Sequence, residues 1–351
     1  MIVVTPATEV TGDSTHRPTI ADVARAAGVS IALVSYALNG RPGVAPATRE
    51  RVLRVADEYG WRPSTSARSV RSGLRAIGLA VGREASGLAR SASFLDLVTE
   101  AGDVLATRDL TLTLQVRAGG DAKAEAEAYR RWWAERRFDV VVVPDVLVDD
   151  PRVAMLHRIG APAVVLAPAD ASSGLGSAAF DEGDAYARIG AYLGELRHRR
   201  VAVVTGPGAL HRTHVRLEAL TAALAPFGGV AEHCPTDATG EEAATATASL
   251  LTSSAPPTAI VYDTDLMAVA GLDVARRFGC LVPWDVSVVS GSDSALCRLA
   301  TPAITSLTSS MADLGAAVGR AVLGVLDGHV PAEVVPAEGI AVRGSTGPVT
   351  G

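Results

Sequence analysis

The sequence lacks the features that hold a protein in a membrane or build it around disulfides. No apolar run in its 351 residues approaches the roughly 20 residues that a transmembrane helix needs. Residues 1–15 lack the charged-then-apolar pattern of a secretory signal, and we expect a disordered tail over residues 1–17. The three cysteines are far apart and have no CxxC spacing, which argues against a disulfide framework or a zinc site. These absences predict a cytoplasmic protein with no membrane partner.

The sequence also lacks the motifs of enzymes that use doubly wound folds. A P-loop, a GxSxG motif and a GxGxxG motif are all missing in the required context; Gly206-Pro207-Gly208 follows an apolar run but lacks the third glycine. His211 and His214 are three residues apart, yet no glutamate or second pair completes a metal site. We therefore expect neither an enzyme nor a bound cofactor.

The charge that is present is unevenly distributed. The chain has a formal net charge of -6, but residues 16–75 hold ten arginines against four acids, a balance of +6. Residues 1–15 contain two acids, so the remainder carries -10. A basic head on an acidic body is the balance expected when only the head meets phosphate groups.

The basic segment reads as a helix-turn-helix head over residues 18–62. Thr19 and Asp22 form a predicted capping box before an apolar stripe at helical spacing, and Gly28 ends that helix. Ser30 can cap a second helix over Ile31–Leu38, which Asn39-Gly40 closes. Helix, a short turn containing glycine, then helix is the layout of a DNA-binding helix-turn-helix.

A third helix and a linker follow this pair. Pro46 suits a first helical position, and we expect a helix over residues 46–59 with Val52, Val55 and Tyr59 facing inward. Residues 63–75 carry three arginines and no obvious core, so they read as a hinge helix or linker.

From residue 76 the pattern changes to short apolar runs that alternate with helical stretches. The runs span residues 77–81, 110–116, 140–143, 163–166, 201–204, 259–262 and 286–289. Helical stretches between them include residues 122–137, 184–196 and 266–278. Strands that alternate with helices predict parallel sheets. The fold class is therefore a small all-α head plus an α/β body over residues 76–345, made of two doubly wound parallel-sheet lobes.

Together these residues closely resemble the lactose-repressor (LacI/GalR) family. The resemblance is carried by Thr19-Ile20-Ala21-Asp22-Val23-Ala24, Ala27-Gly28-Val29-Ser30, Gly60-Trp61-Arg62-Pro63, His198-Arg199-Arg200-Val201-Ala202 and Val282-Pro283-Trp284-Asp285-Val286. It covers nearly the whole chain in the right order. It implies a homodimer that binds double-stranded operator DNA, and a periplasmic-binding-protein-like body whose lobes exchange near residue 180 and residues 305–330.

The resemblance also implies which residues of the head contact DNA. Ile31, Ala32 and Tyr36 on the second helix would read base edges in the major groove. Phosphates would be held by Thr19, Ser30, Ser35 and Asn39. The hinge positions that match the family's minor-groove contacts are Ala67, Arg68 and Val70, with Val70 in place of the family's wedge leucine.

Two positions of the head depart from the family pattern. Many members carry arginine where this chain has Tyr36, so its operator half-site is expected to differ. Ala45 replaces the serine that usually caps the third helix, at a cost of roughly 1 kcal/mol.

In the body, the resemblance implies a small-molecule effector in the cleft between the lobes. Arg216 matches the ligand-gripping arginine, Asp181 matches an acid at the crossover, and Asp265 matches the acid of an Asn-Asp pair. Thr264 replaces the asparagine of that pair, and Ser292 stands where a sugar-binding aspartate is usual. Because these sugar-binding side chains are missing, three alternatives stay open for the effector: a sugar, another small metabolite, or no effector at all.

We expect the protein to be a sequence-specific transcriptional regulator that acts as a repressor. The alternatives are a small-molecule (sugar) binding protein and a regulator without a functional effector site. The basic head argues against the first of these, since a plain sugar-binding protein has no use for it.

Overall fold

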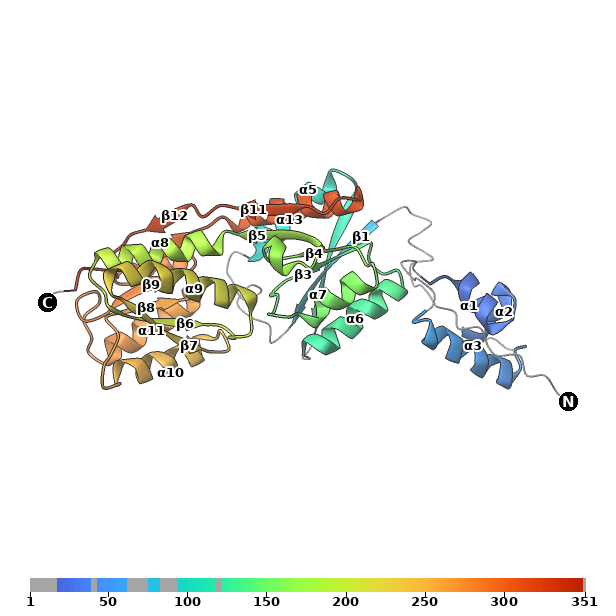
Figure 1. Cartoon of the computed structure of the whole chain (residues 1–351), viewed down its shortest axis with the longest axis horizontal. Coiled ribbons are helices and arrows are strands. Elements are labelled where there is room, and N and C mark those ends of the chain that lie inside the picture. Colours follow the sequence, from blue (N-terminus) through green and yellow to red (C-terminus); the bar gives the residue numbers. More distant parts are fainter. Residues whose placement is uncertain (1–17, 39–42, 62–74, 83–93, 118–120, 350–351) are drawn as a thin grey trace.

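The computed structural model describes residues 18–38, 43–61, 75–82, 94–117 and 121–349. Figure 1 shows three parts in a row: a helical head, a lobe that contains β1 to β5, and a second lobe that contains β6 to β9 and lies at the C-terminal end. The predicted combination of an all-α head with two α/β lobes is confirmed.

The head consists of α1 (Ile20–Ala27), α2 (Ile31–Leu38) and α3 (Pro46–Glu58). The predicted capping box is present: the Asp22 amide donates to the Thr19 hydroxyl, and the Asp22 carboxylate accepts from the Thr19 amide at 2.9 Å. Gly28 adopts the left-handed conformation (φ 65°) that turns the chain from α1 toward α2. As expected from Ala45, α3 begins without a side-chain cap.

The core of the head differs from the prediction at one position. Val52 and Val55 are buried, but Tyr59 is exposed, so its predicted inward orientation is wrong. The reason is that α3 ends at Glu58 and Tyr59 is its C-terminal cap. The amide of Trp61 then donates to the Ala56 carbonyl at 2.7 Å, and this turn places Trp61 in the core instead.

The first lobe is a six-stranded parallel sheet in the order β11-β5-β4-β3-β1-β2. Its strands are β1 (Arg75–Gly82), β2 (Leu110–Arg117), β3 (Val140–Val143), β4 (Ala163–Val165), β5 (Gly176–Phe180) and β11 (Ala332–Val335). One hydrophobic cluster joins the sheet to α5 (Phe94–Ala106) and α13 (Met311–Leu326). A second joins it to α6 (Ala122–Ala134) and α7 (Pro151–Arg158), so both faces are covered.

The second lobe repeats this plan with the strand order β12-β10-β9-β8-β6-β7. Its strands are β6 (Arg200–Thr205), β7 (Val230–Pro235), β8 (Ala259–Tyr262), β9 (Ser287–Ser290), β10 (Thr305–Thr308) and β12 (Gly339–Ala341). The helices α8 (Glu182–Glu195) and α9 (His211–Leu224) share one core cluster with the sheet. The other cluster includes α10 (Gly240–Leu251), α11 (Asp265–Arg277) and part of α12 (Ala295–Leu299).

The chain passes between the two sheets three times: between β5 and α8, between β10 and α13, and between β11 and β12. The third passage explains the one departure from parallel pairing. Because β11 ends at the edge of the first sheet that faces the second, the chain enters the second lobe at the carboxyl ends of its strands. β12 therefore pairs with β10 antiparallel.

Substitution by alanine is expected to have opposite effects on stability at two glycines of the packed helices α5 and α13. A Cβ at Gly315 on α13 would clash with the backbone oxygen of Leu97 on α5, whereas a Cβ at Gly102 on α5 would meet nothing within 4 Å. We expect Gly315→Ala to destabilise the protein by about 1–3 kcal/mol through overpacking. Gly102→Ala should be neutral or stabilising by up to ~1 kcal/mol, since it only raises helix propensity. Urea unfolding at one protein concentration measures both, and equal effects would contradict the close approach of the two helices.

Candidate functional site

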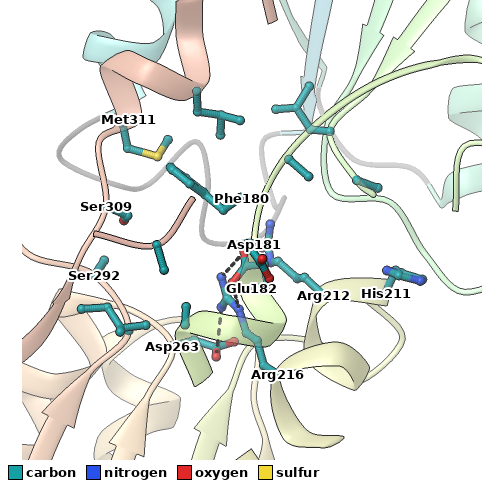
Figure 2. Close-up of a pocket in the computed structure, with 18 of the residues that line it drawn as sticks. Phe180, Asp181, Glu182, His211, Arg212, Arg216, Asp263, Ser292, Ser309 and Met311 are labelled. Carbon is teal, nitrogen blue, oxygen red and sulfur yellow. Dashed lines mark hydrogen bonds and ion pairs between the residues drawn. The ribbon is translucent and has the colours of Figure 1, made fainter. Parts of the chain in front are cut away.

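A pocket lies between the two lobes, at the carboxyl ends of the strands of both sheets (Figure 2). This edge is where parallel α/β sheets generally bind ligands, because loops of several strands converge there. The charged and histidine side chains that line it are Asp145, Asp181, Glu182, His211, Arg212, Arg216 and Asp263. Apolar side chains include Phe180, Leu307, Met311 and Leu314.

Arg216 is the centre of the charged part of the pocket. From α9 it donates through Nε and Nη2 to the two carboxylate oxygens of Glu182, at 2.7 and 2.8 Å. Its Nη1 lies 3.1 Å from Oδ1 of Asp263, which follows β8. The guanidinium also lies over the ring of Tyr186, 5.0 Å from its centroid. Figure 2 shows Glu182 and Asp263 on either side of the arginine.

The surroundings keep Arg216 charged although it is buried. Burial by itself disfavours the cation, but Glu182, Tyr186 and Asp263 outweigh this effect and hold the pKa of Arg216 well above its ordinary value. The hydroxyl of Tyr186 donates to Asp263 at 3.2 Å, and burial raises the pKa of this tyrosine, so it stays neutral. Asp263 also accepts from the Gly206 amide at 3.0 Å. The cluster is thus a preorganised network that links α8, α9 and the ends of β6 and β8.

A second set of contacts joins the lobes beside this cluster. The carboxylate of Asp145, which follows β3, forms an ion pair of 2.5 Å with Arg212 on α9. Next to it the two lobes exchange backbone hydrogen bonds, since the His211 amide donates to the Val146 carbonyl and the Val148 amide donates to the Ala209 carbonyl. The loop after β3 and the loop after β6 therefore form one continuous wall of the pocket.

The structure places most of the predicted effector residues on this pocket. Asp181, Arg216, Thr264 and Ser292 all line it. All four also have contacts within the protein. Arg216 is paired with Glu182 and Asp263, and the Ser292 hydroxyl accepts a backbone hydrogen bond. Asp181 accepts from the Asp184 amide at 3.0 Å as the cap of α8, and Thr264 caps α11.

Asp265 is the exception, because it is not among the residues that line the pocket. It is buried at the start of α11, where its carboxylate accepts from the Leu266 amide at 2.8 Å. Its own amide donates to the Ser292 hydroxyl at 3.0 Å. The acid that this segment does contribute to the pocket wall is Asp263, two residues earlier, where β8 has just ended.

Sequence reasoning missed Asp145, Glu182, Arg212 and Asp263. A usable signal exists for Asp263, which directly follows the buried apolar strand β8 and so lies at the carboxyl edge of its sheet. For Asp145 and Arg212 the signal is weak, because they are far apart in the sequence and meet only when the lobes pack.

In the head, the predicted base-reading residues lie on the exposed face of α2. Ile31 is 50% exposed and Tyr36 is 45% exposed, and Ala32 is exposed beside them. The core is instead formed on this helix by Val34 and Ala37. Ser30 accepts from the Leu33 amide at 3.3 Å as a helix cap, Ser35 is half-buried, and Thr19 is hydrogen-bonded to Asp22. The predicted contacts Asn39, Ala67, Arg68 and Val70 lie outside the described residues.

Among the residues that the structure describes, no group of three or more histidine, cysteine or acidic side chains is arranged to hold a metal ion. Within the same ranges, no single helix is long and apolar enough to cross a membrane; α1 and α2 reach that length only together and are bent by 99°.

Comparison with known proteins decides the family. A sequence model of bacterial regulatory proteins of the lacI family matches residues 19–64, and one of periplasmic binding protein-like domains matches residues 191–346. The HTH-type transcriptional regulator CelR of Thermobifida fusca is 30% identical over 329 residues, covering 90% of this chain and 93% of CelR. The chain belongs to the lacI family of bacterial regulatory proteins. This lacI-family member is also 30% identical to the repressor PurR of Escherichia coli O1:K1 over 312 residues, covering 85% of this chain and 87% of PurR.

Solved structures agree with this assignment. The complex of CelR with cellobiose is 27% identical, with a TM-score of 0.69, and covers 94% of this chain and all of that one. A LacI-family regulator from Bifidobacterium animalis subsp. lactis is 30% identical, with a TM-score of 0.70, over 79% of this chain and 99% of that one. This lacI-family chain is therefore a helix-turn-helix transcriptional regulator with a two-lobed body.

Proposed function

We propose that this regulator is a repressor that binds a pseudo-palindromic operator as a homodimer, and that a small molecule in the inter-lobe pocket modulates this binding. The observation that carries the proposal is the exposed face of α2, where Ile31 and Tyr36 project from a head with its own closed core. Together with Ala32 these side chains form one exposed face of α2, and this is the face that a recognition helix presents to the major groove of DNA.

On DNA, α2 is the recognition helix and lies in the major groove. Ile31 and Ala32 meet the methyl group of thymine, and Tyr36 offers one hydroxyl and a ring to a base edge. Thr19, Ser30 and Ser35 hold phosphates, which sets the register of the head on the duplex. Asn39, Ala67, Arg68 and Val70, which lie outside the described residues, are the further DNA contacts that the family resemblance implies.

Exchange of Tyr36 for arginine tests the assignment of α2. Arginine grips guanine through two hydrogen bonds, so we expect Tyr36→Arg to shift the preferred base to guanine at one position of each half-site. Discrimination at that position should change by roughly 1–3 kcal/mol. Selection of bound sequences from a random DNA pool, with wild type in parallel at the same salt concentration, measures the change. A uniform change in affinity for all sequences would mean that Tyr36 meets phosphate and not a base.

In the body, binding of the effector changes the angle between the lobes and thereby the affinity of the dimer for DNA. Arg216, Asp181, Thr264 and Ser292 contact the effector, together with Glu182 and Asp263. CelR has been solved with cellobiose, so cellobiose is the first compound to test. Operator affinity measured with and without cellobiose and other metabolites tests this part; if none of them changes it, the chain is a regulator without a functional effector site.

Two further statements belong to this proposal. The regulator acts in the cytoplasm, where its DNA is, and it catalyses no reaction. Both are supported by the transcriptional regulators to which it is similar.

A further inference from the structure

Arg216, at the centre of the pocket, already has carboxylate partners. Glu182 engages Nε and Nη2 in a two-point grip at 2.7 and 2.8 Å, and Asp263 faces Nη1 at 3.1 Å. The two acids come from different elements, the start of α8 and the end of β8. The side chain of Glu182 is 17% exposed and that of Asp263 is 5% exposed, so water screens these charges weakly.

Among the residues that the structure describes, acids outnumber guanidinium groups on the pocket wall. Four carboxylates line it, from Asp145, Asp181, Glu182 and Asp263, against two guanidinium groups. The second guanidinium, that of Arg212, is paired with Asp145. Each cation of the described wall is therefore neutralised by an acid of the protein itself.

This arrangement has a direct consequence for what can bind. An anionic ligand that accepts hydrogen bonds from the remaining N–H groups of Arg216 would place its negative charge beside the carboxylates of Glu182 and Asp263, which repel it. A hydroxyl group has no such conflict, because it can donate to Glu182 or Asp263 and accept from the arginine at the same time. The apolar residues Phe180, Leu307 and Met311 on the same wall offer a surface for the carbon face of such a ligand.

We propose that Glu182 is a specificity-determining residue, which makes the inter-lobe pocket reject anionic ligands and select uncharged, hydroxyl-rich ones. The inference rests on the proposed role of this pocket as the effector site. It distinguishes a free sugar from a phosphorylated sugar or a sugar acid by charge alone.

The test uses inorganic phosphate, which is small enough to make the shape of the pocket irrelevant. In the full-length protein, Glu182→Gln keeps the size of the side chain and one oxygen for Arg216 but removes the charge. Glu195→Gln is the matched control, since it makes the same change at an exposed position on the far end of α8. We expect E182Q to bind phosphate at least 10-fold more tightly than both wild type and E195Q, in calorimetric titrations at constant ionic strength.

Phosphate binding to wild type as tight as to E182Q would overturn the proposal, as would the absence of any gain in E182Q. If E182Q does not fold, titration of the wild type with phosphate and gluconate decides, since binding of either with a millimolar or lower Kd contradicts anion rejection and its absence supports it. These outcomes are separate from those of the proposed function, because they are read from ligand binding without DNA. A failure of all metabolites to alter operator affinity would overturn the effector role and leave the phosphate result intact.

Discussion

Replacement of Val34 by asparagine is expected to abolish operator binding and leave the two lobes folded. Val34 is completely buried between the helices of the head. The substitution loses about 1.5 kcal/mol or more of apolar burial and adds about 1–3 kcal/mol for a polar group without a partner. A head of this size has only a few kcal/mol of stability of its own, so it should unfold. Affinity for the selected operator should fall on the order of 100-fold or more, as measured by fluorescence anisotropy.

Leu53→Asn provides the matched control, because Leu53 is 46% exposed on α3 of the same head. It should leave the fold of the head intact and change its stability by no more than about 0.5 kcal/mol. The cooperative unfolding of the lobes should be the same in both variants, since the lobes have separate cores. Retained operator binding in Val34→Asn would contradict the assignment of the head as the DNA-binding part.

The second large effect is expected from Arg152→Met in the first lobe. The side chain of Arg152 is 7% exposed and pairs with Asp150, which is 1% exposed, at 2.7 Å. It also donates to Glu125 and to the carbonyl of Asp145, at 2.7 Å each. Removal of the arginine leaves a buried carboxylate without its counter-ion, which typically costs about 3–5 kcal/mol. Urea unfolding monitored by circular dichroism measures this loss.

The consequence of Arg152→Met should extend beyond stability. Asp150 and Arg152 hold the loop after β3, in which Asp145 adopts a left-handed conformation with φ 51°. That loop carries the ion pair from Asp145 to Arg212 and the backbone hydrogen bonds to the second lobe. We therefore expect the contact between the lobes to weaken as well.

Arg188→Met is the control for this prediction. Arg188 pairs with Asp184 on α8, but both side chains are about half exposed, so their separation should have no effect beyond the few tenths of a kcal/mol typical of such pairs. Equal effects of the two substitutions would show that the pair of Arg152 and Asp150 is solvated and that it does not order the loop.

The elements that the sequence predicts are those specified by interactions between residues close together in the chain. Thr19, Asp22 and Gly28 specify the ends of α1 through hydrogen bonds that span only a few residues, so the sequence alone predicts them. The alternation of apolar runs with helical stretches likewise predicts strands such as β3 and β8, whose residues are all buried. β7, which has no fully buried residue, shows no such run and was not predicted from the sequence.

Tyr59 and Asp265 show where local rules stop. At helical spacing Tyr59 continues the buried stripe of α3. The helix ends at Glu58, one residue before it, and Trp61 packs into the core in place of Tyr59. Asp265 directly follows two residues of the pocket wall in the sequence. Its carboxylate nevertheless accepts from a backbone amide in the first turn of α11, and Asp263 is the acid that faces the pocket.

The sequence by itself determined the class of this protein: a basic helix-turn-helix head, an acidic α/β body and the resemblance that places both in one family. Only the tertiary structure decided what the pocket offers to a ligand. Arg216, Glu182 and Asp263 are distant in the chain and meet because α8, α9 and β8 converge at one edge of a sheet. The sequence identifies the arginine, but whether it is free or neutralised depends on which carboxylates lie within about 3 Å, and only packing sets those distances.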